Sequence, residues 1–250
     1  MDQQQLIILV LCALAALLHG LSGFGFPMLS TAIVANFYPL SISIVVVLIP
    51  CLLLNVCVLC SAPRPIWQSL ITYTQRYALL IIASLIGTSV GVTVLFYLSE
   101  QYLKLMLGLI LLGYVLDQLR ARPLTLQASK QNMVLFGFAA GVIGGASNAM
   151  APLLILYLMA SQHQKNEVVL ISNLIFLLTK IVQLCLLWSL IKQQLAYNWS
   201  LIILLSLTAV LMVLIANRFR QHISQSHFRL GILILLGLLG LQALYQALQL

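Results

Sequence analysis

The chain has 250 residues, of which 62% are hydrophobic and only 6% are charged. Soluble domains carry roughly 25% charged residues, so this composition excludes an ordinary soluble globular protein and indicates a multi-pass membrane protein. The net charge of +8 does not indicate nucleic-acid binding, because Lys and Arg lie in short segments between apolar stretches instead of along one basic face. We therefore expect a lipid bilayer as a partner and no nucleic acid.

Apolar stretches follow one another along the whole chain. The first, Leu6 to Leu18, has 13 residues, which is too few to cross a membrane core that needs about 20 helical residues. A glycine-rich break and a second short segment, Met28 to Tyr38, come next. The loop from Ser61 to Arg76 then separates the first of three predicted spans from the other two: Leu40 to Cys60, Tyr77 to Tyr97 and Tyr102 to Leu119.

The second half of the chain repeats this scheme. A broken segment from Met133 to Met159 precedes three further predicted spans: Val168 to Leu190, Trp199 to Ala216 and Leu230 to Leu248. We therefore divide the chain into a first transmembrane repeat, residues 1–120, and a second, residues 131–250. Similar segments recur at nearly constant spacing, which indicates a duplication: Gly20 and Gly23 with Gly141 and Gly144, Val46 to Ile49 with Val168 to Ile171, and Leu107 to Gly113 with Leu230 to Gly237.

Each broken segment contains residues that interrupt a helix. In the second, Gly144 and Gly145 weaken the helix, and Ser147 and Asn148 are candidates to cap a new helix that tolerates Pro152 in its first turns. The first break has the same character and contains His19, Gly20, Ser22, Gly23, Gly25 and Pro27. A half-helix that begins inside a membrane directs unpaired N–H groups and a partial positive charge at its surroundings, which favours an anion.

The positive charges discriminate between two topologies. If all apolar segments cross the membrane, there are eight crossings. The Lys and Arg residues outside the helix centres then lie six on one side of the membrane and five on the other. If each broken segment re-enters, they divide nine against two, as the positive-inside rule requires: Arg64, Arg76, Arg120, Arg122, Lys130, Lys165, Arg218, Arg220 and Arg229 against Lys104 and Lys192. We predict an all-α polytopic membrane protein with two inverted repeats, each a re-entrant segment plus three transmembrane helices. Tilted first helices that cross once are the alternative.

Lys180 is the one basic residue that lies at the centre of a predicted span, about 18 Å along the helix from the nearest charged position. No carboxylate is expected near it, since the chain has four and all lie at or near segment ends: Asp2, Glu100, Asp117 and Glu167. Asn173 and Gln183 share its helix face. Two interpretations are open: a lysine held by backbone carbonyls freed at the breaks, or a cation that binds an anionic substrate.

Further polar residues could reach the same depth. His19 precedes the first break, and Asn55 lies within the first full span. His19 is either a proton-sensitive group of the site or a neutral side chain bonded to the broken backbone. The predicted substrate-binding set is His19, Gly20, Ser22, Gly23, Gly25, Asn55, Gly144, Gly145, Ser147, Asn148, Asn173, Lys180 and Gln183.

The sequence contains no metal cluster, cofactor motif or nucleophile–base pair, so we expect no cofactor, no metal and no enzymatic activity. The pair Cys57 and Cys60 has a metal-like spacing but no second pair and no nearby His, and we interpret it as small apolar residues. Gly87-Thr-Ser-Val-Gly91 is a face of small residues that lets another helix approach closely. It serves either internal packing or a homodimer.

Several of these motifs resemble those of the TauE/SafE sulfite-exporter family of bacterial inner-membrane proteins, over nearly the whole chain. They are Gly20-Leu-Ser-Gly-Phe-Gly25, Gly87-Thr-Ser-Val-Gly91 with Ser99 to Lys104 and Gly108, and Gly141-Val-Ile-Gly-Gly145 with Pro152. The resemblance implies a multi-pass protein of the bacterial plasma (inner) membrane that transports sulfur-containing oxyanions such as sulfite or sulfonates. The chain departs from the family pattern at Pro27, which follows Gly25 closely, and at Ser147 to Met150, which replace expected glycines.

We therefore predict a secondary transporter of a small anion, a sulfur-containing oxyanion, bound at mid-membrane between two broken helices. Two alternatives stay open. One is a transporter of another small anion such as a carboxylate. The other is a non-transporting membrane assembly or interaction protein.

Overall fold

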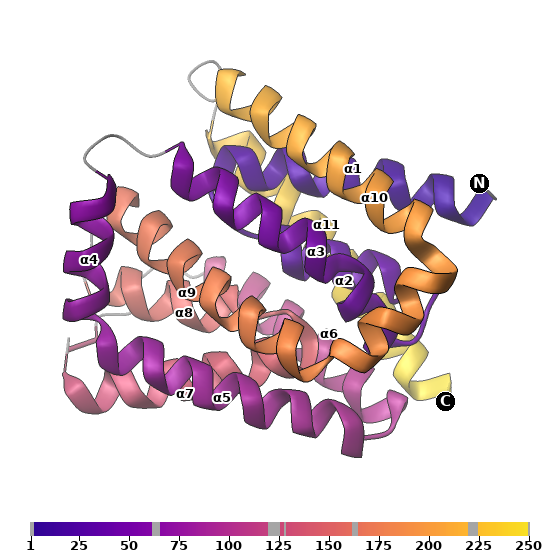
Figure 1. Cartoon of the computed structure of the whole chain (residues 1–250). Helices are drawn as coiled ribbons and strands as arrows, with labels where there is room; N and C mark the ends of the chain where they lie inside the picture. The colour runs from indigo at the N-terminus through magenta and orange to yellow at the C-terminus, as the bar shows by residue number, and fades with distance from the viewer. Residues whose placement is uncertain are drawn as a thin grey trace.

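The computed structural model describes residues 3–61, 66–119, 126–127, 129–161, 165–219 and 225–249, and within these ranges the fold is all α-helical (Figure 1). Several charges used for the topology prediction lie outside the described residues: Asp2, Arg64, Arg120, Arg122 and Arg220. The described ranges still contain both broken segments and all the candidate site residues.

Five helical stretches among the described residues are long and apolar enough to cross a membrane. They are α1 (Gln3–Ser22), α3 (Leu40–Cys60), α5 (Ala78–Tyr97), Glu167–Leu186 of α9 (Lys165–Leu186) and Asn198–Ala216 of α10 (Trp188–Phe219). Large apolar side chains lie exposed on their outer faces, for example Ile82, Ile86 and Val90 on α5. Such faces suit contact with lipid tails and not with water. The chain is thus a polytopic membrane protein.

The first helix is longer than the apolar segment predicted from the sequence, Leu6 to Leu18. α1 has 20 residues, because Gln3 to Gln5 and His19 to Ser22 extend the apolar stretch at both ends. The expectation that this segment is too short to cross is therefore wrong. His19 and Gly20 continue the helix because neighbouring helices bury them, whereas Gln3 and Gln4 extend it at an exposed end. A count of apolar residues detects neither extension.

Two predictions about helices were wrong: one helix was predicted as a loop, and the boundary between two others was predicted at the wrong residue. α4 (Ile66–Arg76) lies where the sequence suggested a loop from Ser61 to Arg76. The predicted span Val168 to Leu190 instead ends at Leu186, and α10 begins at Trp188 and continues to a kink at Asn198. Both segments mix polar and apolar residues, so their helical character does not appear as a long apolar run.

Each broken segment folds into a hairpin. α7 (Lys130–Ser147) is followed by α8 (Ala151–Ala160), and the rings of Phe136 and Tyr157 stack with their centroids 5.4 Å apart. The N–H of Leu126, just before α7, donates to the carbonyl of Ala160 at the end of α8, at 3.0 Å. α8 therefore returns to the side of the protein on which α7 begins.

The hairpin of α1 and α2 (Phe26–Val34) is built in the same way. Gln246, near the end of α11 (Gln225–Gln249), donates through Nε2 to Oδ1 of Asn36, just after α2, at 3.0 Å. Figure 1 shows both chain termini on its right-hand side, opposite α4. α2 therefore ends on the side where α1 begins.

Helices of the two halves pack closely through small residues. Gly87 and Gly91 of α5 contact α7 so closely that an added Cβ would lie under 3.0 Å from the carbonyl oxygens of Phe138 and Val142. Gly20 of α1 contacts α10, where an added Cβ would lie 2.5 Å from the Cβ of Ala216. The predicted close approach at Gly87 to Gly91 is confirmed. This face lies inside the protein, so it offers no surface for a homodimer.

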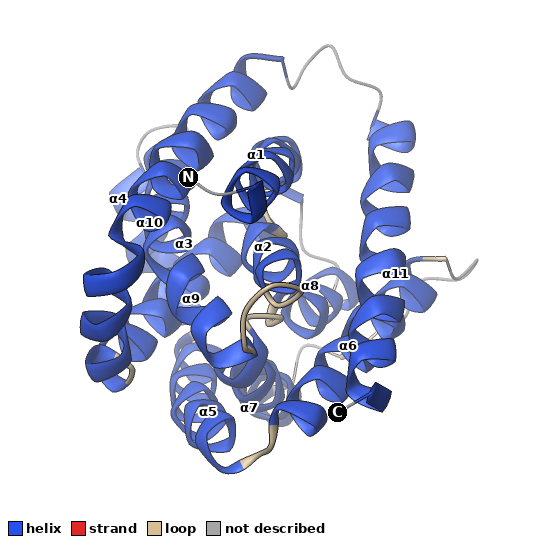
Figure 2. Ribbon diagram, turned by 90° about the vertical axis from the view of Figure 1, so that its right-hand side faces the viewer, coloured by secondary structure: helices blue, strands red, loops and turns tan. Residues whose placement is uncertain are grey.

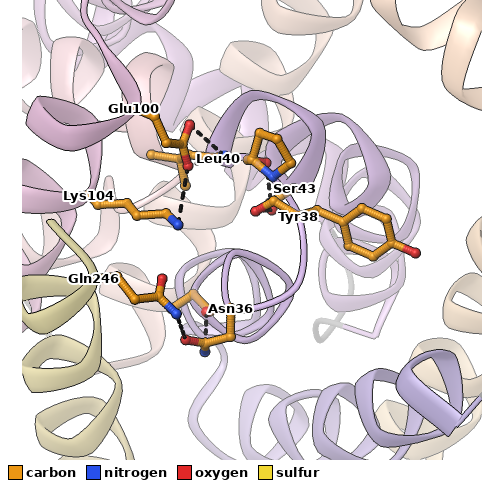
Figure 3. A network of polar contacts seen from close by, with 9 residues as sticks. Asn36, Tyr38, Leu40, Ser43, Glu100, Lys104 and Gln246 are labelled. Carbon is orange, nitrogen blue, oxygen red and sulfur yellow. Dashed lines mark hydrogen bonds and ion pairs between the residues drawn. The ribbon is translucent and has the colours of Figure 1, made fainter. Parts of the chain in front are cut away.

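A polar cluster lies on the side of the termini (Figure 3). Glu100 is in the first turn of α6 (Glu100–Gln118), and the N–H of Leu40 donates to both its carboxylate oxygens, at 2.8 and 3.1 Å. Lys104 Nζ lies 3.5 Å from the same carboxylate. Leu40 begins α3, so this carboxylate satisfies a backbone donor and stabilises the positive end of the helix.

We expect Glu100→Ala to lower the stability of the protein by about 1–2 kcal/mol, because it leaves a buried N–H without its charged acceptor. Thermal unfolding in detergent measures this as a lower Tm. Asp117→Ala, at the opposite end of α6, is the matched control and should leave Tm nearly unchanged. Equal Tm values for Glu100→Ala and the unmodified protein would contradict the assigned role.

Candidate functional site

A pocket lies at the second break, where the N-terminal ends of the two short helices α2 and α8 meet. Figure 2 shows both helices in the middle of the molecule, surrounded by longer ones. The pocket is lined by Pro27, Met28, Thr88, Gly144, Asn148, Met150, Ala151, Phe176, Thr179, Lys180 and Gln183. Residues from both halves of the chain therefore form one site.

Lys180 is the only charged residue in the lining, and it is 5% exposed. Its ammonium donates to the side-chain oxygen of Asn148 and, at 2.5 Å, to that of Gln183. Within the described ranges the one ion pair found is that of Lys104 with Glu100. Neutral amide oxygens thus solvate a buried cation without compensating its charge, and the pocket has a positive potential.

The two amides are fixed by further hydrogen bonds. Asn148 Nδ2 donates to Thr31 Oγ1 of α2 at 2.8 Å. Gln183 Nε2 donates to the carbonyls of Gly144 and Gly145, at 3.2 and 3.1 Å. Both amides therefore direct their oxygens toward Lys180. One network connects α9, the second break and the short helix of the first half.

The two breaks share one hydrogen-bonding pattern. Ser22 and Ser147 each donate to the carbonyl four residues earlier, at 2.8 and 2.7 Å, and each accepts the N–H two residues later, at 3.3 and 3.4 Å. The next residues, Gly23 and Asn148, have left-handed backbones with φ of 86° and 61°. Ser22 and Ser147 are 125 positions apart, as are Pro27 and Pro152. The breaks are thus structurally equivalent at this offset.

A comparison with known protein families covers nearly the whole chain. A family model described as "Sulfite exporter TauE/SafE" matches residues 8–243. The chain belongs to this family. The resemblance predicted from the glycine motifs is confirmed, and TauE/SafE membership implies a membrane transporter of sulfur-containing anions. No curated protein and no solved structure matches the chain.

In this TauE/SafE member the glycines of the second break have another role than the one predicted. α7 continues through Gly144 and Gly145 and ends at Ser147. An added Cβ on Gly145 would lie under 3.0 Å from the carbonyl oxygen of Thr88, and one on Gly144 would lie 2.7 Å from the Cβ of Met150. These glycines permit close packing, and the interruption itself follows three residues later.

The predicted cap of the restarted helix is also wrong. α8 has Met150 at its N-cap position and no side-chain cap. Ser147 is bonded to Ile143 of the preceding helix instead, and Asn148 forms the left-handed end of α7. Pro152 does lie in the first turn of α8, as predicted. The glycine similarity at an offset of 121 had aligned Gly23 with Gly144, whereas the hydrogen bonds align Gly23 with Asn148.

The structure brings part of the predicted set together at the pocket. Gly144, Asn148, Lys180 and Gln183 line it, and Gly145 holds Gln183 through its carbonyl. The other predicted residues lie outside the lining: His19, Gly20, Ser22, Gly23, Gly25, Asn55, Ser147 and Asn173. Most of them surround the first break.

Sequence reasoning did not assign several lining residues of this TauE/SafE site. Thr88 lies inside the small-residue motif of α5, and Thr179 precedes Lys180, where it donates to the carbonyl of Phe176 at 3.0 Å. Thr31 supports the pocket from behind through Asn148. For Thr88, a hydroxyl group within a stretch of small residues was the sequence feature that could have indicated a pocket residue. Thr31 has no such signal, because its partner is 117 positions away.

Within the part of the chain that is described, no group of three or more His, Cys, Asp or Glu side chains could hold a metal ion. The cysteines differ in burial. Cys12 and Cys51 are buried, whereas Cys60 and Cys185 are exposed on the outer surface. The chemistry available in the pocket is therefore hydrogen bonding and positive charge.

Proposed function

We propose that this TauE/SafE member is a secondary transporter that binds a small sulfur-containing oxyanion, such as sulfite or a sulfonate, in the Lys180 pocket. The observation that carries the proposal is a buried ammonium with only neutral partners. A lysine at the centre of a membrane helix costs about 2.5–3.5 kcal/mol on insertion scales. An ammonium has three N–H donors, and the hydrogen bonds to Asn148 and Gln183 leave one for a bound anion.

The ends of the short helices support an anion at the same place. Pro27 and Met28 belong to the first turn of α2, and Ala151 begins α8. Neither helix has a side-chain cap, so the partial positive charge of each N-terminus adds to that of Lys180. Thr88 and Thr179 supply hydroxyl groups in the lining. A small oxyanion accepts hydrogen bonds on every side and matches this set.

The architecture that we propose is two inverted repeats, residues 1–120 and 131–250, each with one re-entrant hairpin. The equivalent breaks support it, as does the exchange of partners in which α5 packs on α7 and α10 packs on α1. In Figure 1 α4, the start of α7 and the end of α10 lie on one side, and these ends carry Arg76, Lys130 and Arg218. The positive-inside rule assigns this side to the cytoplasm of a bacterial plasma membrane.

Transport then follows from movement of the two repeats around a fixed central site. The lining residues come from both halves, so rocking one half against the other exposes the anion to either side in turn. Thr31 and Asn148 join the halves at the pocket. Their hydrogen bond is a contact that such movement has to alter.

The test is a panel of anions on the purified protein: sulfite, sulfate, thiosulfate, methanesulfonate, sulfoacetate and acetate. We expect at least one sulfur-containing anion to raise Tm in detergent and to be transported by proteoliposomes. Protection by acetate alone would contradict the substrate class. Protection and flux by none of these anions would contradict transport through this pocket and favour an assembly or interaction protein.

A further inference from the structure

Three fully buried polar side chains have unused hydrogen-bonding atoms: one precedes the first break in α1, and the other two lie in α3 and α9. His19, Asn55 and Asn173 are each 0% exposed. Among the described residues, no hydrogen-bond partner is found for His19 Nε2, for either polar atom of the Asn55 amide, or for Asn173 Oδ1. Unpaired buried polar atoms are costly, at about 1–3 kcal/mol each, so a cluster of them in one region indicates a ligand-binding role.

Two of the three side chains are held against the same short stretch of backbone. The carbonyl of His19 accepts the N–H of Gly23 at 2.6 Å, and Asn173 Nδ2 donates to the carbonyl of Gly23 at 2.7 Å. His19 Nδ1 accepts the N–H of Phe26, the first residue of α2, at 3.3 Å. A neutral His19 that accepts at Nδ1 carries its proton on Nε2, so the unused atom is a donor.

Asn55 belongs to this region by its position in the repeat. It is the sixteenth residue of α3, and Lys180 is the sixteenth residue of α9. The two helices begin 125 positions apart, at Leu40 and Lys165, which is the offset that relates the two breaks. Lys180 reaches the second break through Asn148. Asn55 therefore has the equivalent position toward the first break.

The first break is loosely packed at one backbone position. Gly25 is buried, has a φ of 109° and lies directly before Phe26. A Cβ added to Gly25 would meet no atom within 4 Å. Buried positions in a packed interior normally have neighbours at van der Waals distance. Space thus exists beside the N-terminus of α2, next to the residue that His19 binds.

We propose that His19, Asn55 and Asn173 form a second, uncharged oxyanion site that takes the singly protonated form of the substrate, such as hydrogen sulfite. This inference rests on the proposed function. His19 Nε2–H and the Asn55 NH₂ group donate to oxygens of the anion, and the N-terminus of α2 favours its charge. The amide oxygens of Asn55 and Asn173 lack a donor, and the single O–H of hydrogen sulfite donates to one of them.

The two sites then recognise different features of one ligand. The Lys180 site binds by charge and accepts any small oxyanion, whereas the site at the first break needs a hydroxyl on the anion. An anion without a hydrogen would place its oxygens against the two amide oxygens, which is repulsive. Passage through the second site therefore carries a proton together with the anion and requires no carboxylate of the protein to relay it.

Calorimetric titration of the purified full chain with sodium sulfite tests the inference, in anaerobic buffer at a pH where sulfite is partly protonated. We expect two sulfite ions to bind each chain, one of which is lost in Asn55→Leu and the other in Lys180→Met. One bound sulfite that is lost in Lys180→Met and unaffected by Asn55→Leu would refute the second site and leave the proposed function intact. No sulfite binding at all would refute both.

Sodium sulfate is the second probe, because it is an oxyanion without a hydroxyl group under these conditions. We expect one sulfate per chain, with equal binding to Asn55→Leu and to the unmodified protein. Loss of a bound sulfate in Asn55→Leu would refute the requirement for a protonated ligand. Ser206→Ala is the control for removal of a buried polar group, because that hydroxyl donates to the carbonyl of Ile202 within its own helix, α10.

The Asn55 variant is expected to fold. Leu has the same number of side-chain heavy atoms, branched in the same way, and suits an apolar helix. The replacement removes two unsatisfied atoms, so Tm should be unchanged or higher. Asn55→Ala is the second variant and is expected to lose the same sulfite ion. Retention of both sulfite ions by a folded Asn55→Ala variant would overturn the assignment.

Discussion

Lys180→Met is expected to abolish anion flux in proteoliposomes while the protein stays folded. Met has a similar length and no charge, so the packing around the side chain is retained and only the ammonium is lost. A hydrogen bond to a charged group contributes about 1.5–3 kcal/mol, which corresponds to roughly 10- to 100-fold in affinity. The loss of the positive potential of the pocket adds to this effect.

The stability of the same variant distinguishes a binding role from a structural one. The hydrogen-bond partners of Lys180 are neutral amides, so its removal also removes the cost of burying a charge. We expect an unchanged or higher Tm in detergent. Lower stability together with normal flux would indicate a lysine that only holds the second break together.

Lys192→Met is the matched control for charge. Lys192 is exposed at the start of α10, where its ammonium lies 5.4 Å from the centre of the Trp188 ring. It lies outside the pocket, so flux should stay close to that of the unmodified protein. Equal losses of flux in both variants would mean that net positive charge, and not the Lys180 site, determines transport.

Gly91→Ala is expected to cause the largest loss of stability. A Cβ at this position would lie under 3.0 Å from backbone atoms of Val142 and Gly145, and backbone cannot move aside as a flexible side chain can. α5 and α7 would have to separate along their whole contact, and overpacking of this kind costs about 1–3 kcal/mol or more. We expect a clearly lower Tm and poor recovery of folded protein by size-exclusion chromatography.

Gly113→Ala provides the comparison on another helix. Gly113 lies on the exposed face of α6, and an added Cβ would meet no atom within 4 Å. Ala is favoured over Gly in a helix by about 0.8–1 kcal/mol, so stability should be equal or slightly higher. A Gly91→Ala protein as stable as Gly113→Ala would show that α5 and α7 are not packed as closely as the structure has them.

The sequence predicted most of the long helices and both interruptions, because these depend on local properties. A run of apolar residues has to leave water whatever it packs against, and Pro152 is favoured in the first turn of a helix. The importance of Lys180 was equally local, since its distance from every charged position is a property of one helix. The glycine motifs that indicated the family are also local, because each consists of a few neighbouring residues.

Helices with mixed composition were not predicted correctly. α4 and the first part of α10 alternate polar and apolar residues, and nothing in their apolar length distinguishes them from loops. The glycines of the second break were misinterpreted for a related reason. Gly144 and Gly145 weaken an isolated helix, but here neighbouring helices stabilise it through to Ser147 and use the absent side chains for close contact.

The sequence by itself determined that this is a membrane protein, that two of its helical segments are interrupted and that one cation has to be buried. These features follow from hydrophobicity, proline and charge, which act on the chain locally. Only the tertiary structure decided which groups meet at those breaks. The hydrogen bonds of Lys180 to Asn148 and of Asn148 to Thr31 join positions 32 and 117 residues apart. Such pairs form because the hairpins of the two halves pack together, and no local preference of the chain encodes them.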